Sequence, residues 1–246
     1  MNVTAVVLAR DEAAFIGACL QSLAAVTADV LVLDACSQDA TPEIARAHGA
    51  RVVQQKWIGF AAARNAALAL AQASDWVLFV DADERMPPPL AREIRALACR
   101  PPEAVDGCWI ARRNVICGRI MRGGGWWPDY QLRLLRPARC AYPEDRAVHE
   151  SAICSGPTLA LNCPLLHLNY RSWSEFAAKQ AAFARLAAMT APAPRRRAYI
   201  GAPGRSFLRR IVSERGYLDG THGLAAAALL SASEVYGVWL ARRSQA

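Results

Sequence analysis

Short apolar runs recur along the first eighty residues, and longer segments rich in alanine and leucine separate them. The runs cover residues 3–9, 30–33, 52–53 and 77–80. Strand-length runs that alternate with helix-length segments are typical of βαβ units, which build a parallel sheet. The sequence therefore predicts an α/β fold with a mainly parallel central sheet.

Helix signals fall between these runs. In "DATPEIARAHG" we expect Thr41 to be the N-cap, Pro42 the first helical position and Gly49 the stop. Helices are also expected at about 60–73 and 90–98. Each would connect two strands of the sheet.

The end of the chain has a different texture. From Ser172 the sequence becomes helical, and Ser172 and Glu175 have the spacing of a capping box. Residues 1–150 hold 17 basic and 17 acidic side chains, whereas residues 151–246 hold 12 basic and 4 acidic, so the whole net charge of +8 belongs to the later part. We expect one domain over 1–170 and a basic helical extension over 171–246.

Two features of the extension point to a membrane. Arginines such as Arg195, Arg196 and Arg197 precede a segment in which apolar residues flank Arg209 and Arg210, a composition that suits an anionic membrane surface. A solvated arginine face is the alternative. Residues 223–241 are about long enough to span a bilayer, but they are rich in alanine and carry a glutamate, which favours a packed or surface-lying helix.

The eight cysteines include no CxxC pair. A chain of this length needs no disulfide scaffold, so we expect reduced thiols in a cytosolic protein. The N-terminal "MNVTAVVLARDE" has no basic region before its apolar run and is expected to be the first strand, not a signal peptide.

Aspartates follow three of the apolar runs. Asp11, Asp34 and the pair Asp81 and Asp83 stand where strands are expected to end, and such ends face the binding crevice of an open parallel sheet. Asp81 and Asp83 could turn toward one Mg²⁺ or Mn²⁺ that bridges to a diphosphate. The alternative is that they only start a turn. Asp34 could accept hydrogen bonds from a base or ribose, or cap a loop.

The order and spacing of these motifs resemble those of a known family. "ARDE", "DACSQDAT", "AAARNAAL" and "VDADE" are similar to the family 2 glycosyltransferases with the GT-A fold. "IARRNVICGRIMRGGGWWPDYQLRLLR", "VHES", "LLHLNYRSWSEFAAKQ" and "RGYLDGTHG" resemble its lipopolysaccharide-core branch, the WaaE/KdtX-like glucosyltransferases. The resemblance covers essentially the whole chain and implies a Rossmann-like GT-A fold.

The resemblance implies a nucleotide-sugar donor, a divalent metal at the DxD aspartates and transfer with inversion to a sugar hydroxyl. The implied donor-binding residues are Ala9, Asp11, Glu12, Asp34, Arg64, Asp81 and Ala82. The sequence departs from the family at Asp11, where Asn is common, and at Ala35, where Ser is usual.

Two carboxylates compete for the role of catalytic base. The resemblance implies Glu150 in "VHE", and Asp129 in "GWWPDY" is the rival; either could instead be structural. Asp83 is the expected metal ligand, and His167 or His149 could add an imidazole, which suits Mn²⁺ better than Mg²⁺. A buried core histidine is the alternative for each.

Further residues could contact the donor or acceptor. Arg64, Asn65, Arg133 and Arg136 could contact phosphates or be ordinary surface charge. The three glycines of "RGGGWWPD" favour a mobile loop whose tryptophans stack on sugars, unless the tryptophans simply pack. Glu84 and Arg85 are expected to be a solvated pair.

The favoured function is transfer of a hexose, expected to be glucose from UDP-glucose, to a lipid-linked saccharide of the lipopolysaccharide core. Such an enzyme is expected in the cytoplasm, on the cytoplasmic face of the inner membrane. A nucleotidyltransferase is the enzymatic alternative, but "ARDEAAF" lacks its Gly-rich loop. The non-enzymatic alternative is a membrane- or nucleic-acid-binding module, which the neutral first 150 residues disfavour. We expect no nucleic-acid partner.

Overall fold

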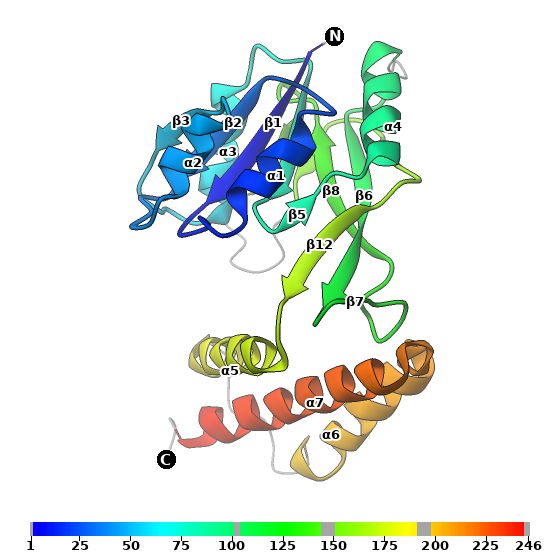
Figure 1. Ribbon diagram of the computed structural model, residues 1–246. Helices are drawn as coiled ribbons and strands as arrows, with labels where there is room; N and C mark the ends of the chain where they lie inside the picture. The colour runs from blue at the N-terminus through cyan, green and yellow to red at the C-terminus, as the bar shows by residue number, and fades with distance from the viewer. Residues whose placement is uncertain (1, 101–103, 144–150, 191–197, 244–246) are drawn as a thin grey trace. The chain divides into compact units, whose positions relative to one another are not determined.

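The computed structural model describes residues 2–100, 104–143, 151–190 and 198–243 (Figure 1). They form two compact units. Unit 1 comprises residues 1–112 and 130–167, and unit 2 comprises residues 113–129 and 168–246. The separation of a domain over 1–170 from an extension over 171–246 stays a prediction.

Unit 1 is built on a sheet whose first four strands are parallel. They are β1 (Val3–Ala9), β2 (Val30–Asp34), β3 (Arg51–Gln54) and β4 (Trp76–Asp81). Their order is β3-β2-β1-β4, and each neighbouring pair is parallel. The interior of β4 is buried throughout, as expected of a strand covered on both faces. The predicted α/β class with a mainly parallel sheet is confirmed.

In the described part of the chain, six further strands complete the sheet. β4 is followed in order by β8 (Asp129–Leu135), β6 (Gly107–Ile116), β12 (Leu165–Tyr170) and β5 (Glu84–Arg85), while β7 (Arg119–Ile120) and β11 (Thr158–Ala160) pair with β6. β9 (Cys140–Ala141) and β10 (Ile153–Cys154) form a separate pair. The antiparallel pairing of β12 with β5 puts His167 opposite Glu84, beside the DxD aspartates.

Helices cover both faces of the parallel strands (Figure 1). They are α1 (Ile16–Leu23), α2 (Thr41–Ala47), α3 (Phe60–Leu70) and α4 (Pro88–Cys99). Alternate residues of β1 point to opposite faces of the sheet. Ala5 and Val7 pack with residues of α1, α2 and α4, whereas Val6 packs with residues of α3. Two apolar layers therefore hold the strand ends in place.

Unit 2 is helical. It contains α5 (Trp173–Thr190), α6 (Ala198–Leu208), a π-helical turn η1 (Arg209–Ser213), a 3₁₀ turn η2 (Gly216–Asp219) and α7 (Gly220–Arg243). Its apolar cluster joins Ile116 and Met121 to Phe176 and Ala226. The Glu175 amide donates to the Ser172 hydroxyl over 3.1 Å, as expected of an N-cap, but the Glu175 carboxylate accepts from the Arg171 amide.

Thr41 is not the N-cap of α2. It is the first helical residue, and Ala40 precedes the helix without a side-chain cap. The Thr41 hydroxyl instead accepts a hydrogen bond from the Glu12 amide over 2.8 Å and donates to Asp39. The predicted cap was wrong because this side chain ties the loop after β1 to the start of α2.

The glycine run 123–125 is packed and does not form the expected mobile loop. The Gly123 amide donates to the buried Asp219 carboxylate over 2.9 Å, and the Gly124 amide donates to the Glu214 carbonyl over 2.7 Å. A Cβ on Gly123 would lie 2.1 Å from the Arg215 carbonyl oxygen. Close backbone approach accounts for glycine here.

Cys140 and Cys154 form a disulfide that joins β9 to β10. The expectation that all eight cysteines are reduced thiols is therefore wrong for this pair. The other six cysteines are free.

Candidate functional site

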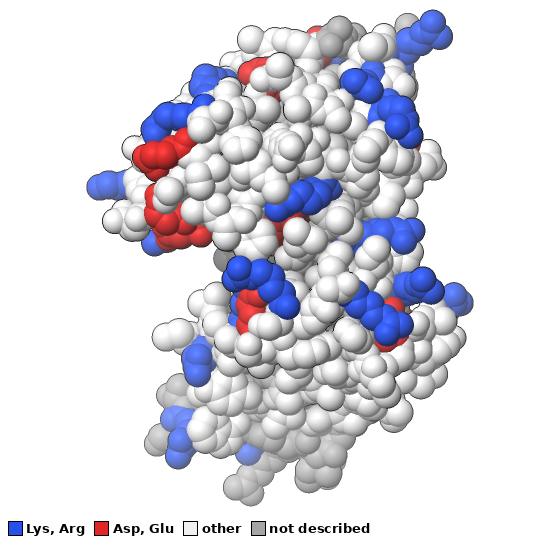
Figure 2. Space-filling model, in the orientation of Figure 1, with Lys and Arg blue, Asp and Glu red and all other residues white. Residues whose placement is uncertain are grey.

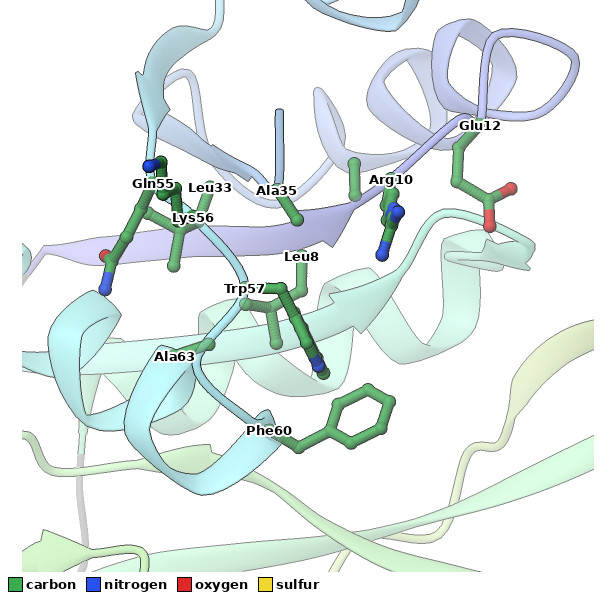
Figure 3. Close-up of a pocket in the computed structure, with 11 residues that line it drawn as sticks. Leu8, Arg10, Glu12, Leu33, Ala35, Gln55, Lys56, Trp57, Phe60 and Ala63 are labelled. Carbon is green, nitrogen blue, oxygen red and sulfur yellow. The ribbon is translucent and has the colours of Figure 1, made fainter. Parts of the chain in front are cut away.

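A cavity of about 390 Å³ opens at the carboxyl ends of β1 and β2 (Figure 3). Leu8, Leu33 and Ala63 supply apolar surface, and the rings of Trp57 and Phe60 meet edge to face with centroids 4.5 Å apart. The remaining lining residues are Ala9, Arg10, Glu12, Ala35, Gln55 and Lys56. The cavity combines flat aromatic groups with charged groups at the sheet edge where a ligand was expected.

Two of the predicted donor-binding residues, Ala9 and Glu12, line this cavity. Asp11 lies in the adjacent loop with φ of 55°, and its carboxylate accepts from the Gln38 amide over 2.7 Å. Asp and Asn are the residues besides glycine that most readily adopt this left-handed conformation. The replacement of the family's Asn by Asp11 therefore suits the backbone.

Asp34 is buried at the end of β2. Its carboxylate accepts hydrogen bonds from the Ser37 amide and from Gln54 Nε2, both over 3.2 Å. These bonds fix the loop that follows β2, which contributes Ala35 to the cavity lining. The contact of Asp34 with a base or ribose stays a prediction.

Asp81 and Asp83 have different surroundings. Arg133 reaches Asp81 from β8 and donates to both carboxylate oxygens. Burial alone would raise the pKa of Asp81, but the charge and hydrogen bonds of Arg133 outweigh it and hold that pKa below its usual range. Asp81 therefore carries a negative charge that is already balanced by an arginine.

Glu84 belongs to the same buried cluster. One of its oxygens accepts from the Asp81 amide over 2.9 Å, and the other lies 3.2 Å from Arg133 and 3.7 Å from Arg112. Burial raises the pKa of Glu84 despite these arginines. The expected solvated pair of Glu84 and Arg85 is wrong: Glu84 is fully buried, and Arg85 donates to the carbonyls of Ala82 and Glu84.

Asp83 faces His167. The distance from Asp83 Oδ2 to His167 Nε2 is 3.4 Å, and the imidazole is largely buried. Pairing of β12 with β5 brings these two residues together although they are far apart in the sequence. The two residues predicted to be metal ligands are thus neighbours.

The remaining residues near the DxD sequence are held by the fold. The Ala82 side chain is buried in the core, so its backbone is the part available to a ligand. Arg64 is close enough to help lower the pKa of Asp81, and its guanidinium lies 5.2 Å from the ring centre of Tyr142. The Cys19 thiol on α1 donates a hydrogen bond to the Asp81 carbonyl, and burial raises the pKa of the Cys19 thiol to about 12.

Two other residues that could contact phosphate make contacts within the fold, and their contact with phosphate stays a prediction. Asn65 exchanges two 2.8 Å hydrogen bonds with the backbone of Tyr142. The Arg136 guanidinium lies over the Trp76 ring, 4.5 Å from its centre, and donates to the Val105 carbonyl.

The candidate bases lie in different parts of the chain. Asp129 begins β8 and belongs to unit 2, where Asn114 Nδ2 donates to its carboxylate over 3.3 Å. In the same unit Trp126 packs edge-on against Phe176, and Trp127 lies under Arg113. Glu150 and His149, like Arg195, Arg196 and Arg197, lie outside the described residues.

Reasoning from the sequence missed several residues of the site. Gln55, Lys56, Trp57 and Phe60 follow directly after β3, so the rule that located Asp34 at a strand end could have found them. The role of Glu84 had no such signal, because it depends on arginines that arrive from β6 and β8.

Comparison with known proteins shows the family to which the chain belongs. Residues 4–151 match the family described as Glycosyl transferase family 2. The chain belongs to this family. The family match also confirms the predicted GT-A-like fold.

Individual members of the family and other relatives match only part of this chain and part of their own length. The lipopolysaccharide core biosynthesis glycosyltransferase LpsC of Rhizobium meliloti is 28% identical over 167 residues, which are 63% of this chain and 58% of LpsC. A glycosyltransferase of Rickettsia felis is 34% identical over 93 residues, 38% of this chain and 32% of the relative. A TPR repeat-containing protein of Synechococcus elongatus is 41% identical over 86 residues, which are 35% of this chain and 21% of that protein.

Among solved structures, glucosyl-3-phosphoglycerate synthase of Mycobacterium tuberculosis in complex with Mn²⁺ and UDP aligns with a TM-score of 0.40 and 27% identity. The alignment covers 46% of this chain and 44% of that one. This family 2 glycosyltransferase thus spans less than two thirds of the length of each relative it matches here.

The side chains of Asp83 and His167 at the sheet edge have the chemistry to hold a divalent metal. A carboxylate and a neutral imidazole are ligands that Mn²⁺ accepts, and adjacent ligands of an octahedral ion at about 2.1 Å lie about 3 Å apart, close to the 3.4 Å between Asp83 and His167. Within residues 2–100, 104–143, 151–190 and 198–243, no group of three or more His, Cys, Asp or Glu forms a complete metal site.

Proposed function

We propose that this protein is a metal-dependent, inverting glycosyltransferase that moves a hexose from a UDP-sugar to a saccharide carried on a lipid. Glucose from UDP-glucose and a lipopolysaccharide-core acceptor are the proposed substrates. The observation that carries the proposal is the Asp83 and His167 pair, which lies in the same unit as the aromatic cavity at the ends of β1 and β2.

The cavity is the proposed site of the nucleoside. Its volume of about 390 Å³ lies in the range of small-molecule pockets, which typically enclose about 300–1,000 Å³. Trp57 and Phe60 offer faces and edges for a pyrimidine, while Arg10 and Lys56 supply positive charge for the diphosphate. Glu12 at the rim can accept a hydrogen bond from a ribose or base.

Asp83 and His167 are the residues that would hold Mn²⁺ or Mg²⁺ against the donor diphosphate. The bound metal would stabilise the negative charge that develops on the leaving diphosphate. Asp81 has another role in this proposal: with Arg133 and Glu84 it fixes the turn that presents Asp83. Arg64 adds positive charge next to that turn.

Inversion requires a single displacement, in which the acceptor oxygen attacks the anomeric carbon as the diphosphate leaves. A base must take the acceptor proton, and a carboxylate within hydrogen-bond reach can do this. Glu150 is the first candidate and Asp129 the second. Asn114, which donates to Asp129, would keep that carboxylate oriented.

The excess of basic residues after position 150 supports an anionic acceptor and a membrane-bound location. LpsC, the relative that the chain matches over 167 residues, acts in lipopolysaccharide core biosynthesis according to its name. We place the enzyme on the cytoplasmic face of the inner membrane, where UDP-sugars and nascent glycolipids meet.

The test compares Asp83→Asn and His167→Asn with Glu43→Gln, which alters an exposed carboxylate on α2. Wild-type protein and Glu43→Gln should be stabilised against heat by UDP together with Mn²⁺, and should hydrolyse UDP-glucose in a Mn²⁺-dependent manner. Both site variants should lose the Mn²⁺-dependent stabilisation and the Mn²⁺-dependent hydrolysis, while they still bind UDP without metal. Unchanged Mn²⁺ dependence in both variants would refute the assignment.

A further inference from the structure

Helix α5 exposes large apolar side chains on one side. Phe183 is 60% exposed, Leu186 61% and Met189 84%. Residues three apart lie on the same side of a helix, so the three side chains form one stripe. On the opposite side of the helix Ala184 is buried and packs against Gly237 of α7. The stripe is therefore additional to the face that α5 needs for folding.

A groove of about 440 Å³ runs beside this stripe, between α5 and α7. Small side chains make the groove: Ala187 and Ala188 line it from α5, and Gly237 and Ala241 line it from α7. A Cβ on Gly237 would lie 3.4 Å from the Ala184 carbonyl oxygen, so the helices approach closely at that point. The remaining lining is apolar except for Gln180, Ser233 and Glu234, and the Glu234 carboxylate is paired with Arg210.

Aromatic and cationic side chains lie together on α7, outside the lining of the groove. The rings of Tyr236 and Trp239 stack with centroids 6.0 Å apart. The Arg243 guanidinium lies 4.4 Å from the Trp239 ring centre, and Arg185 of α5 lies 5.7 Å from that of Tyr236. Aromatic rings beside arginines are typical of the boundary between lipid headgroups and acyl chains.

The charge of this region favours an anionic partner. Residues 151–246 hold 12 basic and 4 acidic side chains, and each acid has a partner in the fold. Glu175 pairs with Lys179, Glu214 with Arg209 and Glu234 with Arg210, while Asp219 is buried. In Figure 2 the surface along α7 is largely uncharged, with Lys and Arg toward its two ends. Basic residues therefore border a largely uncharged face.

We propose that α5 and α7 form the face by which this protein lies on an anionic lipid bilayer, with one acyl chain in the groove between them. The helices lie in the plane of the interface. Residues 216–243 are long and apolar enough to cross a membrane by length and composition, but α7 packs along α5 and carries Glu234. The proposed function explains why the protein would be at a membrane, and this inference rests on it. The surfaces of α5 and α7 indicate which part of the protein makes the contact.

The first test is sedimentation with vesicles of phosphatidylglycerol and phosphatidylethanolamine, compared with vesicles of phosphatidylcholine alone. Wild-type protein should bind the anionic vesicles at least tenfold more tightly, and should be released by alkaline carbonate. Equal binding to both vesicle types, or resistance to carbonate, would overturn the proposal, because the first removes the role of charge and the second indicates a spanning helix.

The second test replaces the stripe. The triple variant Phe183→Ser, Leu186→Ser, Met189→Ser should bind anionic vesicles about a hundredfold more weakly, since three apolar side chains no longer enter the bilayer. Ile153→Ser is the matched control, because Ile153 is 53% exposed but lies on β10 of unit 1. Equal losses in the two variants would show that exposed apolar residues bind vesicles without regard to place.

Stabilisation by UDP and Mn²⁺ is measured on the same proteins. It should be unchanged in the triple variant, so failure of the docking face and failure of the donor site give different results. A measurement on the unaltered chain covers the case in which the triple variant does not fold: vesicles with brominated acyl chains should quench the tryptophan fluorescence of wild-type protein more than that of Trp239→Phe. Equal quenching would place Trp239 outside the bilayer and refute the proposal.

Discussion

Asp81 and Asp83 are two residues apart, yet their side chains have different environments. Asp81 is bound by Arg133, whereas Asp83 lies beside His167. The difference follows from the turn after β4, in which the buried Glu84 accepts the Asp81 amide. At the scale of residues, one aspartate belongs to a charge-balanced structural cluster, and the other is directed to the proposed metal.

The first prediction concerns this cluster. Arg133→Met should lower the free energy of unfolding by about 3–5 kcal/mol, because it leaves the buried Glu84 and the partly exposed Asp81 without their main counter-charge. Arg133 is 4% exposed and Glu84 is fully buried, so solvent cannot replace the lost partner. Urea unfolding measures the change.

Arg46→Met is the control for this prediction, because the Arg46 pair with Glu43 is exposed. It should change stability by less than about 1 kcal/mol. Adding Glu84→Gln to Arg133→Met should recover part of the loss. Equal, small effects of Arg133→Met and Arg46→Met would contradict the description of a buried cluster.

At the scale of elements, the loop before β8 depends on a turn from the far end of the chain. The buried Asp219 carboxylate in η2 accepts from the amides of Arg122 and Gly123. The loop continues to Trp126, whose carbonyl accepts from Asn114, and Asn114 also donates to Asp129. One candidate base is thus oriented through contacts that begin at η2.

The second prediction follows from this connection. Asp219→Asn keeps the shape of the side chain but turns an amide donor toward backbone donors, so we expect a loss of about 2–3 kcal/mol of stability. Glu234→Gln on α7 is the control, since the Glu234 side chain is 44% exposed and its pair with Arg210 lies at the surface. Its effect should stay below about 1 kcal/mol. Urea unfolding of both variants checks the difference, and equal effects would show that the Asp219 bonds are dispensable.

Elements were predictable from the sequence where the pattern was local. The four parallel strands and their connecting helices follow from apolar runs and helix signals, and each lies within a few residues of its expected place. β5 has only two residues, and its partner β12 is distant in the sequence, so no local period indicated their pairing. The neighbourhood of Asp83 and His167 therefore could not be derived from spacing.

At the scale of the whole molecule, the family match and the compact units do not coincide. The match ends at residue 151, but unit 2 takes residues 113–129 from within it and joins them to residues 168–246. The apolar cluster of unit 2 accordingly combines Ile116 and Met121 with Phe176 and Ala226. A boundary drawn by composition alone could not reveal this shared core, because both parts look complete in sequence.

The third prediction is that a chain ending at residue 170 will not be stable by itself. Ile116 and Met121, both nearly fully buried in the complete chain, would lose their cover. Exposing large apolar side chains costs about 1.5–3 kcal/mol each. We expect a lower unfolding temperature and aggregation of the short chain in thermal unfolding followed by light scattering. Unfolding at the temperature of the full chain would instead support an independent domain over 1–170.

The pairing of β12 with β5 has a consequence for biosynthesis. His167 is made long after Asp83, so a growing chain carries the first proposed ligand while the second does not yet exist. A metal that needs both ligands binds only once the later strand has been added to the sheet. Retention of Mn²⁺ would therefore report that β12 has joined the sheet, and chains that end before His167 would leave the ion in solution.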